Sequence, residues 1–150
     1  MSQIAVGFVV SAAVMEQAAS CCARGDQPAM RTALAPHAFE HFPWSGYVIV
    51  VLGEWLREHE VELPVSGEAV FRRLIEIHAP MLFARGAAAA ALAAQLEVLT
   101  PPPEELARYW TEFTGENVPE ATQFMTDAFG WITRLARAGT NADWCVLFEG

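Results

Sequence analysis

The stretch PEATQFMTDAFGWITRLARAG, residues 119–139, carries the pattern from which we begin to predict the fold. Arg134 and Arg137 lie near its C-terminal end, where the helix dipole favours positive charge, and Gly139 is typical of a helix end. Its apolar side chains recur every three or four residues, the spacing of one helix face: Phe124, Ala128, Trp131, Ile132 and Leu135. A long amphipathic helix is therefore predicted here, with Asn117 and Pro119 at its start.

The segments on either side of this helix predict a short strand and a second helix. The alternation in Trp144–Phe148 is typical of a strand, although a single strand needs a partner. Upstream, Pro101–Pro103 indicates a stiff corner within one domain, because the 47 residues that follow it are few for an independent core. A helix is predicted between the two, with Glu104 and Glu105 in its first turn, Gly115 at its end and an apolar face of Leu106, Tyr109, Trp110 and Phe113.

The middle of the chain predicts further helices. Tyr47–Leu52 is rich enough in β-branched residues to be a strand, but Gly53–Glu60 continues a helical pattern, so a helix capped by Ser45 is favoured. Val61–Val65 contains a proline and is interpreted as an extended connector. Ser66 is expected to cap the next helix, which Pro80 breaks or kinks before a second helical stretch that runs to Leu99 and includes the alanine-rich residues 87–94.

The N-terminal residues are predicted to form a first core helix. Ile4, Phe8, Ala12, Met15, Ala19 and Cys22 form one stripe at helical spacing, with Ser2 as the cap and Gly25 as the end. A signal peptide is the rejected alternative, because no positive charge precedes the apolar run and Glu16-Gln17 interrupts it. Asp26 and Pro28 then open a short helix that Pro36 ends. The predicted fold is all-α: one compact domain over residues 1–150, mainly helical with about seven helices and at most a short terminal β element.

Composition indicates a surface that meets a partner or a ligand. Apolar residues make up 53% of the chain and charged residues 18%, which is more apolar than an ordinary soluble domain. No apolar run is long enough to cross a membrane. The surplus predicts a pocket, a second subunit or a docking face beyond the interior of the fold.

The charge of the chain limits the class of partner. The net charge is −9, with nine arginines and no lysine. Because the cations are scattered, no basic stripe exists for nucleic acid, and an anionic membrane would repel the chain. A basic protein is the partner that this charge favours. The odd count of three cysteines, Cys21, Cys22 and Cys145, indicates reduced, buried thiols in a cytoplasmic protein.

The stretch PHAFEHFPW, residues 36–44, is the richest in groups that carry chemistry. His37 and His41 would share a face of a helix, and with Glu40 they resemble the H-x-x-E-H motif of inverted zinc proteases. That resemblance implies zinc held by the two histidines and a water polarised by Glu40. A ligand pocket is an alternative, with Trp44 and Tyr47 as apolar walls beside the same three polar residues. A loop over core aromatics is the third interpretation.

A second string, Arg73 to His78, matches the R-x4-H spacing and resembles the all-helical ribonucleases of the HEPN family. The resemblance implies that these two residues act on an RNA phosphodiester across a dimer. Leu74 stands where that family often has a polar residue, and the acidic surface opposes an RNA substrate. The alternative is an ordinary helix end at which His78 meets C-terminal carbonyl groups.

The favoured function is a small acidic bacterial cytosolic module that docks or neutralises a protein partner, similar in size and charge to immunity proteins and antitoxins. Alanine-rich, lysine-free composition is typical of a GC-rich bacterial genome. A helical protein with a small-molecule or metal site around His37–Tyr47 is the alternative. No catalytic motif supplies a mechanism, so an enzyme is not favoured. A homodimer is also expected, through one of two aromatic-bearing helices whose interface candidates are Tyr109, Trp110, Phe113 and Trp131.

Overall fold

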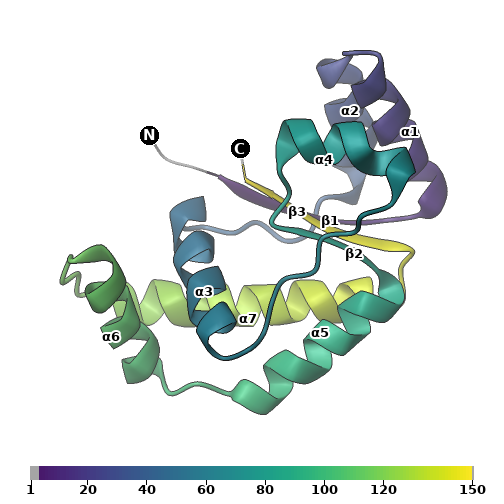
Figure 1. Cartoon of the computed structure of the whole chain (residues 1–150). Coiled ribbons are helices and arrows are strands. Elements are labelled where there is room, and N and C mark those ends of the chain that lie inside the picture. The colour runs from purple at the N-terminus through teal and green to yellow at the C-terminus, as the bar shows by residue number, and fades with distance from the viewer. Residues whose placement is uncertain (1–3, 150) are drawn as a thin grey trace.

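The computed structural model of the protein describes residues 4–149. These residues form seven α-helices, three β-strands and two short 3₁₀-helices at Ala35–His37 and Ala69–Phe71 (Figure 1). The elements are, in chain order, β1 (Ala5–Val10), α1 (Ala12–Ala23), α2 (Gln27–Leu34), α3 (Gly46–Glu58), α4 (Arg72–His78), β2 (Leu82–Arg85), α5 (Gly86–Leu99), α6 (Pro103–Thr114), α7 (Ala121–Gly139) and β3 (Trp144–Glu149). The predicted seven helices are confirmed, and 62% of the residues are helical. The chain is not purely all-α, because the terminal strand belongs to a three-stranded sheet.

The sheet joins the two ends of the described chain. Its order is β1-β3-β2, so the C-terminal strand lies in the middle and is antiparallel to both neighbours. Ala5 is opposite Glu149 in one ladder, and Leu82 is opposite Leu147 in the other. The partner that the predicted strand required is therefore supplied by residues far away in the sequence.

Both outer strands of the sheet are bordered by connecting segments. The Phe39 amide donates a 2.7 Å hydrogen bond to the Gly7 carbonyl on β1. On β2, Phe83 donates to the Pro64 carbonyl and accepts from the Ser66 amide, at 2.9 and 2.8 Å. These bonds occupy backbone groups that an exposed sheet edge would offer to another strand.

Helices cover both faces of the sheet. In Figure 1, α1, α2 and α4 lie above it, and α3, α5, α6 and α7 lie below it. Because side chains alternate along a strand, Trp144 and Val146 join the upper hydrophobic cluster while Cys145 and Leu147 join the lower one. The middle strand is thus buried on both faces, which explains its nearly continuous apolar sequence.

The N-terminal prediction was wrong over residues 5–10, which form a strand instead of the first turns of a helix. Val6, Val9 and Val10 favour extended backbone, and the strand pairs with β3 along its whole length. The helix begins at Ala12, where the Ser11 hydroxyl accepts from the Val14 amide at 3.2 Å. The predicted cap, Ser2, lies outside the described residues.

The prediction for residues 80–99 was right about the helix and wrong about its beginning. Pro80 follows the end of α4, as expected, but β2 precedes α5. Ser66 does not cap a helix directly; its hydroxyl contacts the carboxylate of Glu68 at 3.1 Å, and the first helical turn starts at Ala69. The helical interpretation of Tyr47–Leu52 is confirmed by α3, and Val61–Val65 lies outside any helix, with an isolated bridge between Val65 and Phe83.

The three cysteines are free and buried, as the sequence indicated. Burial raises the pKa of the Cys145 thiol to about 12. Cys21 and Cys22 belong to the upper cluster, and Cys145 belongs to the lower one. Within residues 4–149, no helix combines the length and the apolar character that a membrane crossing requires.

Candidate functional site

Residues 38–45, between His37 and the first residue of α3, run as an irregular connector across α7. His37 ends a 3₁₀-helix, and regular helix resumes only at Gly46, where the Ser45 hydroxyl accepts from the Tyr47 amide at 3.3 Å. His37 and His41 are therefore not placed on one face of a helix, which was the premise of the zinc-protease resemblance.

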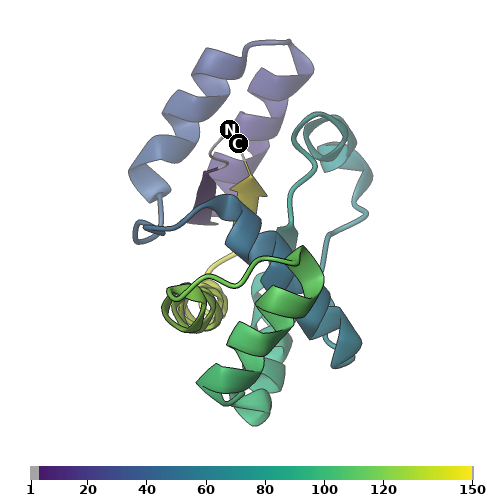
Figure 2. The same ribbon diagram turned by 90° about the vertical axis from the view of Figure 1, so that its left-hand side faces the viewer.

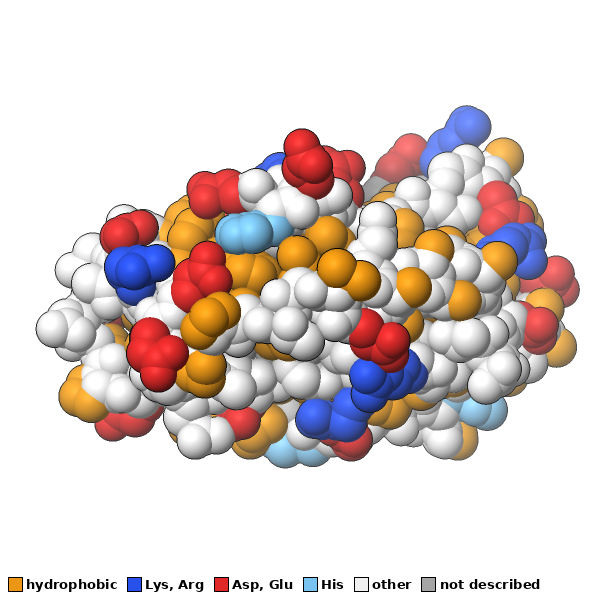
Figure 3. All heavy atoms as spheres, turned by 90° about the horizontal axis from the view of Figure 1, so that it is seen from below, with side chains coloured by type: hydrophobic (Ala, Val, Ile, Leu, Met, Phe, Trp, Pro, Cys, Tyr) orange, Lys and Arg blue, Asp and Glu red, His pale blue; other side chains and the backbone are white. Residues whose placement is uncertain are grey.

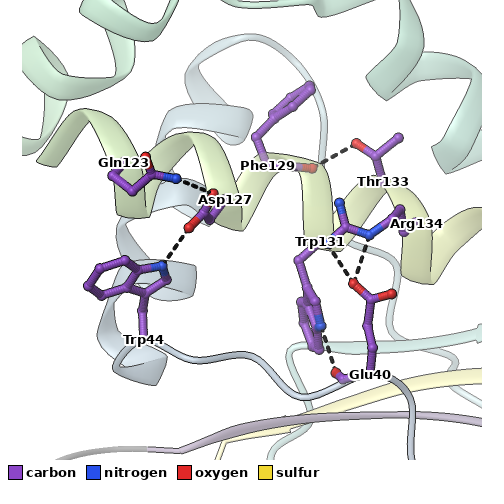
Figure 4. Close-up of polar contacts among 8 residues, drawn as sticks. All are labelled: Glu40, Trp44, Gln123, Asp127, Phe129, Trp131, Thr133 and Arg134. Atoms are coloured by element: carbon purple, nitrogen blue, oxygen red, sulfur yellow. Dashed lines mark hydrogen bonds and ion pairs between the residues drawn. The ribbon is translucent and has the colours of Figure 1, made fainter. Parts of the chain in front are cut away.

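Polar contacts fix this connector to α7 (Figure 4). Trp131 Nε1 donates to the Glu40 carbonyl at 2.9 Å, and Arg134 Nε donates to the Glu40 carboxylate at 2.7 Å. Further along, Trp44 Nε1 donates to Asp127 Oδ2 at 2.8 Å. Glu40 is thus held through its main chain and its side chain at once.

The donor groups of the predicted metal site are not assembled. The Glu40 carboxylate pairs with Arg134 of α7, so its charge is already matched by a guanidinium. Within residues 4–149, no group of three or more His, Cys, Asp or Glu side chains is placed to hold a metal ion. The residues present do not fit a zinc centre, and we derive no chemistry through one.

A pocket does form between the connector and α7, and we call it the His41 pocket. Its volume is about 430 Å³, and it is lined by His41, Phe42, Pro43, Thr126, Asp127, Gly130, Trp131 and Arg134. That size is within the range of small-molecule sites. Of the five ligand-binding residues predicted from the sequence, only His41 lines it, and Glu40 borders it through Arg134.

Trp44 and Tyr47 belong instead to an aromatic cluster beside α6. The Trp44 ring lies 5.8 Å from Phe124, and the Tyr47 ring lies 5.8 Å from Trp110. Trp110 and Phe124 meet edge to face at 4.6 Å, which joins the two pairs. Sequence reasoning missed Asp127, Gly130 and Arg134 as pocket residues, because nothing local shows which face of α7 the connector crosses.

The four predicted interface residues divide between core and surface. Trp110 and Trp131 are 6% and 2% exposed, so their rings are core groups in this structure. Phe113 is 45% exposed and stacks on the half-buried Tyr109, with ring centroids 5.8 Å apart. Tyr109 and Phe113 therefore form an aromatic pair that reaches the surface of α6.

The charge of the molecule is concentrated around this pair. We use the name acidic end for residues 54–62, in the second half of α3 and the turn after it, together with residues 104–120, in α6 and the loop after it. This region carries a net charge of −7 out of −9 for the chain, from Arg57 and Arg108 against nine carboxylates: Glu54, Glu58, Glu60, Glu62, Glu104, Glu105, Glu112, Glu116 and Glu120. Figure 3 shows several acidic side chains at the end of the molecule where α6 lies, and others toward the opposite end of the same face.

A small cleft of about 180 Å³ lies within the acidic end, between α3 and α6. The His59 ring stacks on Trp55 with centroids 3.9 Å apart, and its Nδ1 donates to the Trp55 carbonyl at 2.8 Å. The Tyr109 hydroxyl donates to Glu58 at 3.2 Å. Burial, strengthened by the negative charge of Glu58, raises the pKa of Tyr109 to about 12. The cleft is therefore lined by ordered, proton-bearing aromatic groups among carboxylates.

The arginines without an ion pair lie in the opposite half of the molecule. Five of the nine arginines contact carboxylates: Arg57, Arg85, Arg108, Arg134 and Arg137. The other four have no ion pair with any residue in 4–149 and lie on or beside the three helices of the upper layer: Arg24, Arg31, Arg72 and Arg73. The net negative charge of the acidic end and the unpaired arginines thus lie in different parts of the molecule.

The residues of the ribonuclease resemblance lie on α4, a helix of seven residues. Arg73 is exposed, and the half-buried His78 donates from Nε2 to the Gln27 side-chain carbonyl at 2.8 Å. His78 thus contacts α2 through Gln27.

In comparisons with protein families, curated proteins and solved structures, nothing matches this chain.

Proposed function

We propose that this protein is an interaction module that binds a basic protein partner through the acidic end. The observation that carries the proposal is the segregation of charge: a net −7 lies in two short segments that α3 and α6 bring together. A field of one sign over one end of a molecule steers an oppositely charged partner to that end. The stacked Tyr109 and Phe113 add apolar contact area within the same region.

The charged surface also supports a class of partner. Proteins that bind nucleic acid are basic where they contact phosphates, so an acidic surface can compete for the same contacts. This chemistry fits a cytosolic bacterial module that neutralises its partner, as immunity proteins and antitoxins do. The proposal therefore favours a partner whose own function uses a cationic surface, rather than a partner that buries mainly apolar area.

Binding to host proteins with a matched pair of variants tests the proposal. The immobilised protein is exposed to lysate of its own host, and bound proteins are quantified. Glu104→Gln with Glu116→Gln removes two charges from the acidic end, while Glu16→Gln with Glu76→Gln removes two exposed charges elsewhere. A partner of the acidic end should bind the first variant about fivefold more weakly and the second variant unchanged. High salt should release that partner from the wild type.

The result that would overturn the proposal is equally specific. If the proteins retained by the wild type are retained equally by both variants and at high salt, the acidic end is not the docking surface. The proposal that the protein is an interaction module would also lose support if the immobilised protein retained no more protein from an active host lysate than the bare resin does.

A homodimer remains a prediction, and the charge distribution limits how it could form. Two copies that met through α6 would bring two acidic ends together, and like charges across an interface cost free energy. A dimer should therefore use another surface and leave the acidic end free. Light scattering of purified protein at tens of micromolar measures the mass; a strict monomer would remove the homodimer from the proposal.

The His41 pocket favours a second candidate function, the binding of a small molecule. Asp127 and Arg134 place opposite charges on its wall beside the ring of Phe42. Native mass spectrometry of the purified protein should then show a small ligand that is lost in Gly130→Leu, which fills the pocket. Elemental analysis of the same sample checks the zinc prediction. If neither the wild type nor Gly130→Leu carries a bound ligand or metal, this candidate function loses its support.

A further inference from the structure

A second pocket lies on the opposite half of the molecule, against the upper face of the sheet. We call it the α2 pocket; its volume is about 420 Å³. Figure 2 shows α2 and α4 on opposite sides of the end of β3, the region in which this pocket forms. Its lining is mainly apolar and includes Phe8 from β1, Met30 and Leu34 from α2, and Phe148 from β3. Phe8 and Phe148 meet edge to face at 5.9 Å, so the floor is an ordered aromatic pair.

Two basic side chains border this apolar floor. Arg31 projects from α2 and has no ion pair with any residue in 4–149. His78 comes from the end of α4, and its Nε2 bond to Gln27 fixes the ring. Burial, with a smaller effect of the nearby Arg31 charge, lowers the pKa of His78, so the imidazole is neutral at neutral pH. Arg31 is then the positive charge at the pocket.

Glu149 on β3 also lines the pocket, but the alternation of the strand directs its side chain to the other face of the sheet. Glu149 follows Leu147 in the alternation of β3, which places its side chain on the lower face of the sheet together with Leu147. Its Oε1 is buried there without a hydrogen-bond partner among the described residues. Glu149 therefore forms no ion pair with Arg31, and the guanidinium has no carboxylate partner among residues 4–149.

We propose that the α2 pocket binds a small amphipathic carboxylate, a free aliphatic acid of medium chain length. The apolar chain of the acid packs on Phe8, Leu34 and Phe148, and its carboxylate pairs with the Arg31 guanidinium. The volume is within the range of small-molecule sites, and such sites combine apolar walls with a few polar groups. Guanidinium binds a carboxylate with two parallel hydrogen bonds, which selects an acid over an alcohol.

This site is independent of the acidic end, because the two surfaces share no residue and lie on opposite sides of the sheet. A cationic amphiphile is the ligand class that the pocket disfavours, since Arg31 would repel its head group. An uncharged alcohol of the same chain length keeps the apolar contact and loses the ion pair. These three probes separate recognition of a carboxylate from unspecific apolar adsorption.

Calorimetric titration of the folded protein with sodium decanoate, below its micellar concentration, tests the proposal. Decanoate should bind at one site, with decanol about fivefold weaker and decylamine not bound at the α2 pocket. Arg31→Gln should weaken decanoate binding about fivefold and leave decanol unchanged. Ala35→Phe, which places a ring in the pocket, should abolish binding of both. Arg72→Gln removes another unpaired charge and should leave both affinities unchanged.

Circular dichroism confirms that each variant is folded before it is titrated, and Arg31 is exposed, so its replacement should not disturb the core. Equal affinity for decanoate and decanol, or unchanged decanoate binding by Arg31→Gln, would overturn the assignment of a carboxylate. No saturable binding by the wild type, or unchanged binding by Ala35→Phe, would overturn the site itself.

Discussion

Gly139 lies so close to Cys145 that a Cβ atom on the glycine would stand 2.5 Å from the Cys145 Cβ. This contact joins the end of α7 to the middle strand of the sheet. A Cβ on Gly139 would also come within 3.2 Å of the Ala89 Cβ on α5. Both opposing atoms are attached directly to backbone, so neither can move away by a side-chain rotation.

Gly139→Ala should therefore destabilise the fold by about 2 kcal/mol or more, because overpacking a close contact forces the backbone apart. Urea unfolding followed by circular dichroism measures the free energy. Gly53→Ala is the matched control: inside α3, the added Cβ would meet no other part of the fold within 4 Å, and the substitution should stabilise by up to about 1 kcal/mol. Equal effects of the two substitutions would show that the approach of α7 to β3 is not this tight.

The attachment of the connector to α7 should contribute more to the free energy of unfolding through Trp44 than through Arg134. Trp44 Nε1 donates to the half-buried Asp127 carboxylate, and a hydrogen bond to a charged group contributes about 1.5–3 kcal/mol. The Arg134–Glu40 pair is about half exposed, and such pairs contribute about 0.2–1 kcal/mol. Unfolding of Trp44→Phe and Arg134→Gln should show this order. A larger loss for Arg134→Gln would mean that the ion pair is the main attachment of the connector.

Helices that carry their own periodicity could be predicted from the sequence, and the two outer strands could not. In α7 and α6 the apolar stripe, the acidic or prolyl start and the glycine at or after the end all agree, so local pattern and tertiary structure coincide. β1 was predicted as helix because Ile4 and Phe8 continue a stripe that Ala12 and Met15 carry. Its strand conformation depends on pairing with β3, more than a hundred residues away, which no local pattern shows.

For the candidate sites too, individual residues could be predicted from the sequence, whereas their neighbours in space could not. The charges of the acidic end are visible in the sequence as two clusters of glutamates, but only the fold shows that α3 and α6 bring them together. The apolar surplus that predicted a docking face is largely used by two hydrophobic clusters on either side of the sheet. His41 and Glu40 could be selected from the sequence, whereas their neighbours Asp127 and Arg134 required the crossing of the connector over α7.

Acidification should lower stability through His78. Burial lowers the pKa of the folded imidazole below its ordinary value of 6.5, so the unfolded state takes up a proton first as the pH falls. The free energy of unfolding should therefore decrease as the pH drops below about 6.5 and level off once the folded ring is also protonated. His78→Gln should flatten this part of the profile in urea unfolding between neutral and mildly acidic pH. If the free energy of unfolding changes with pH as steeply in His78→Gln as in the wild type, the pH dependence arises from other titratable groups.

Alkaline pH should lower stability through Tyr109, in the acidic end. Burial, assisted by Glu58, raises the pKa of the folded phenol to about 12 from an unfolded value of 10.0. Between these values the unfolded state loses its proton first, so the free energy of unfolding should fall as the pH rises above 10. Spectrophotometric titration should show a late tyrosine ionisation, and Tyr109→Phe should remove that step. A late step that persists in Tyr109→Phe would place that ionisation in another group, and the burial of Tyr109 in the cleft between α3 and α6 would lose its support.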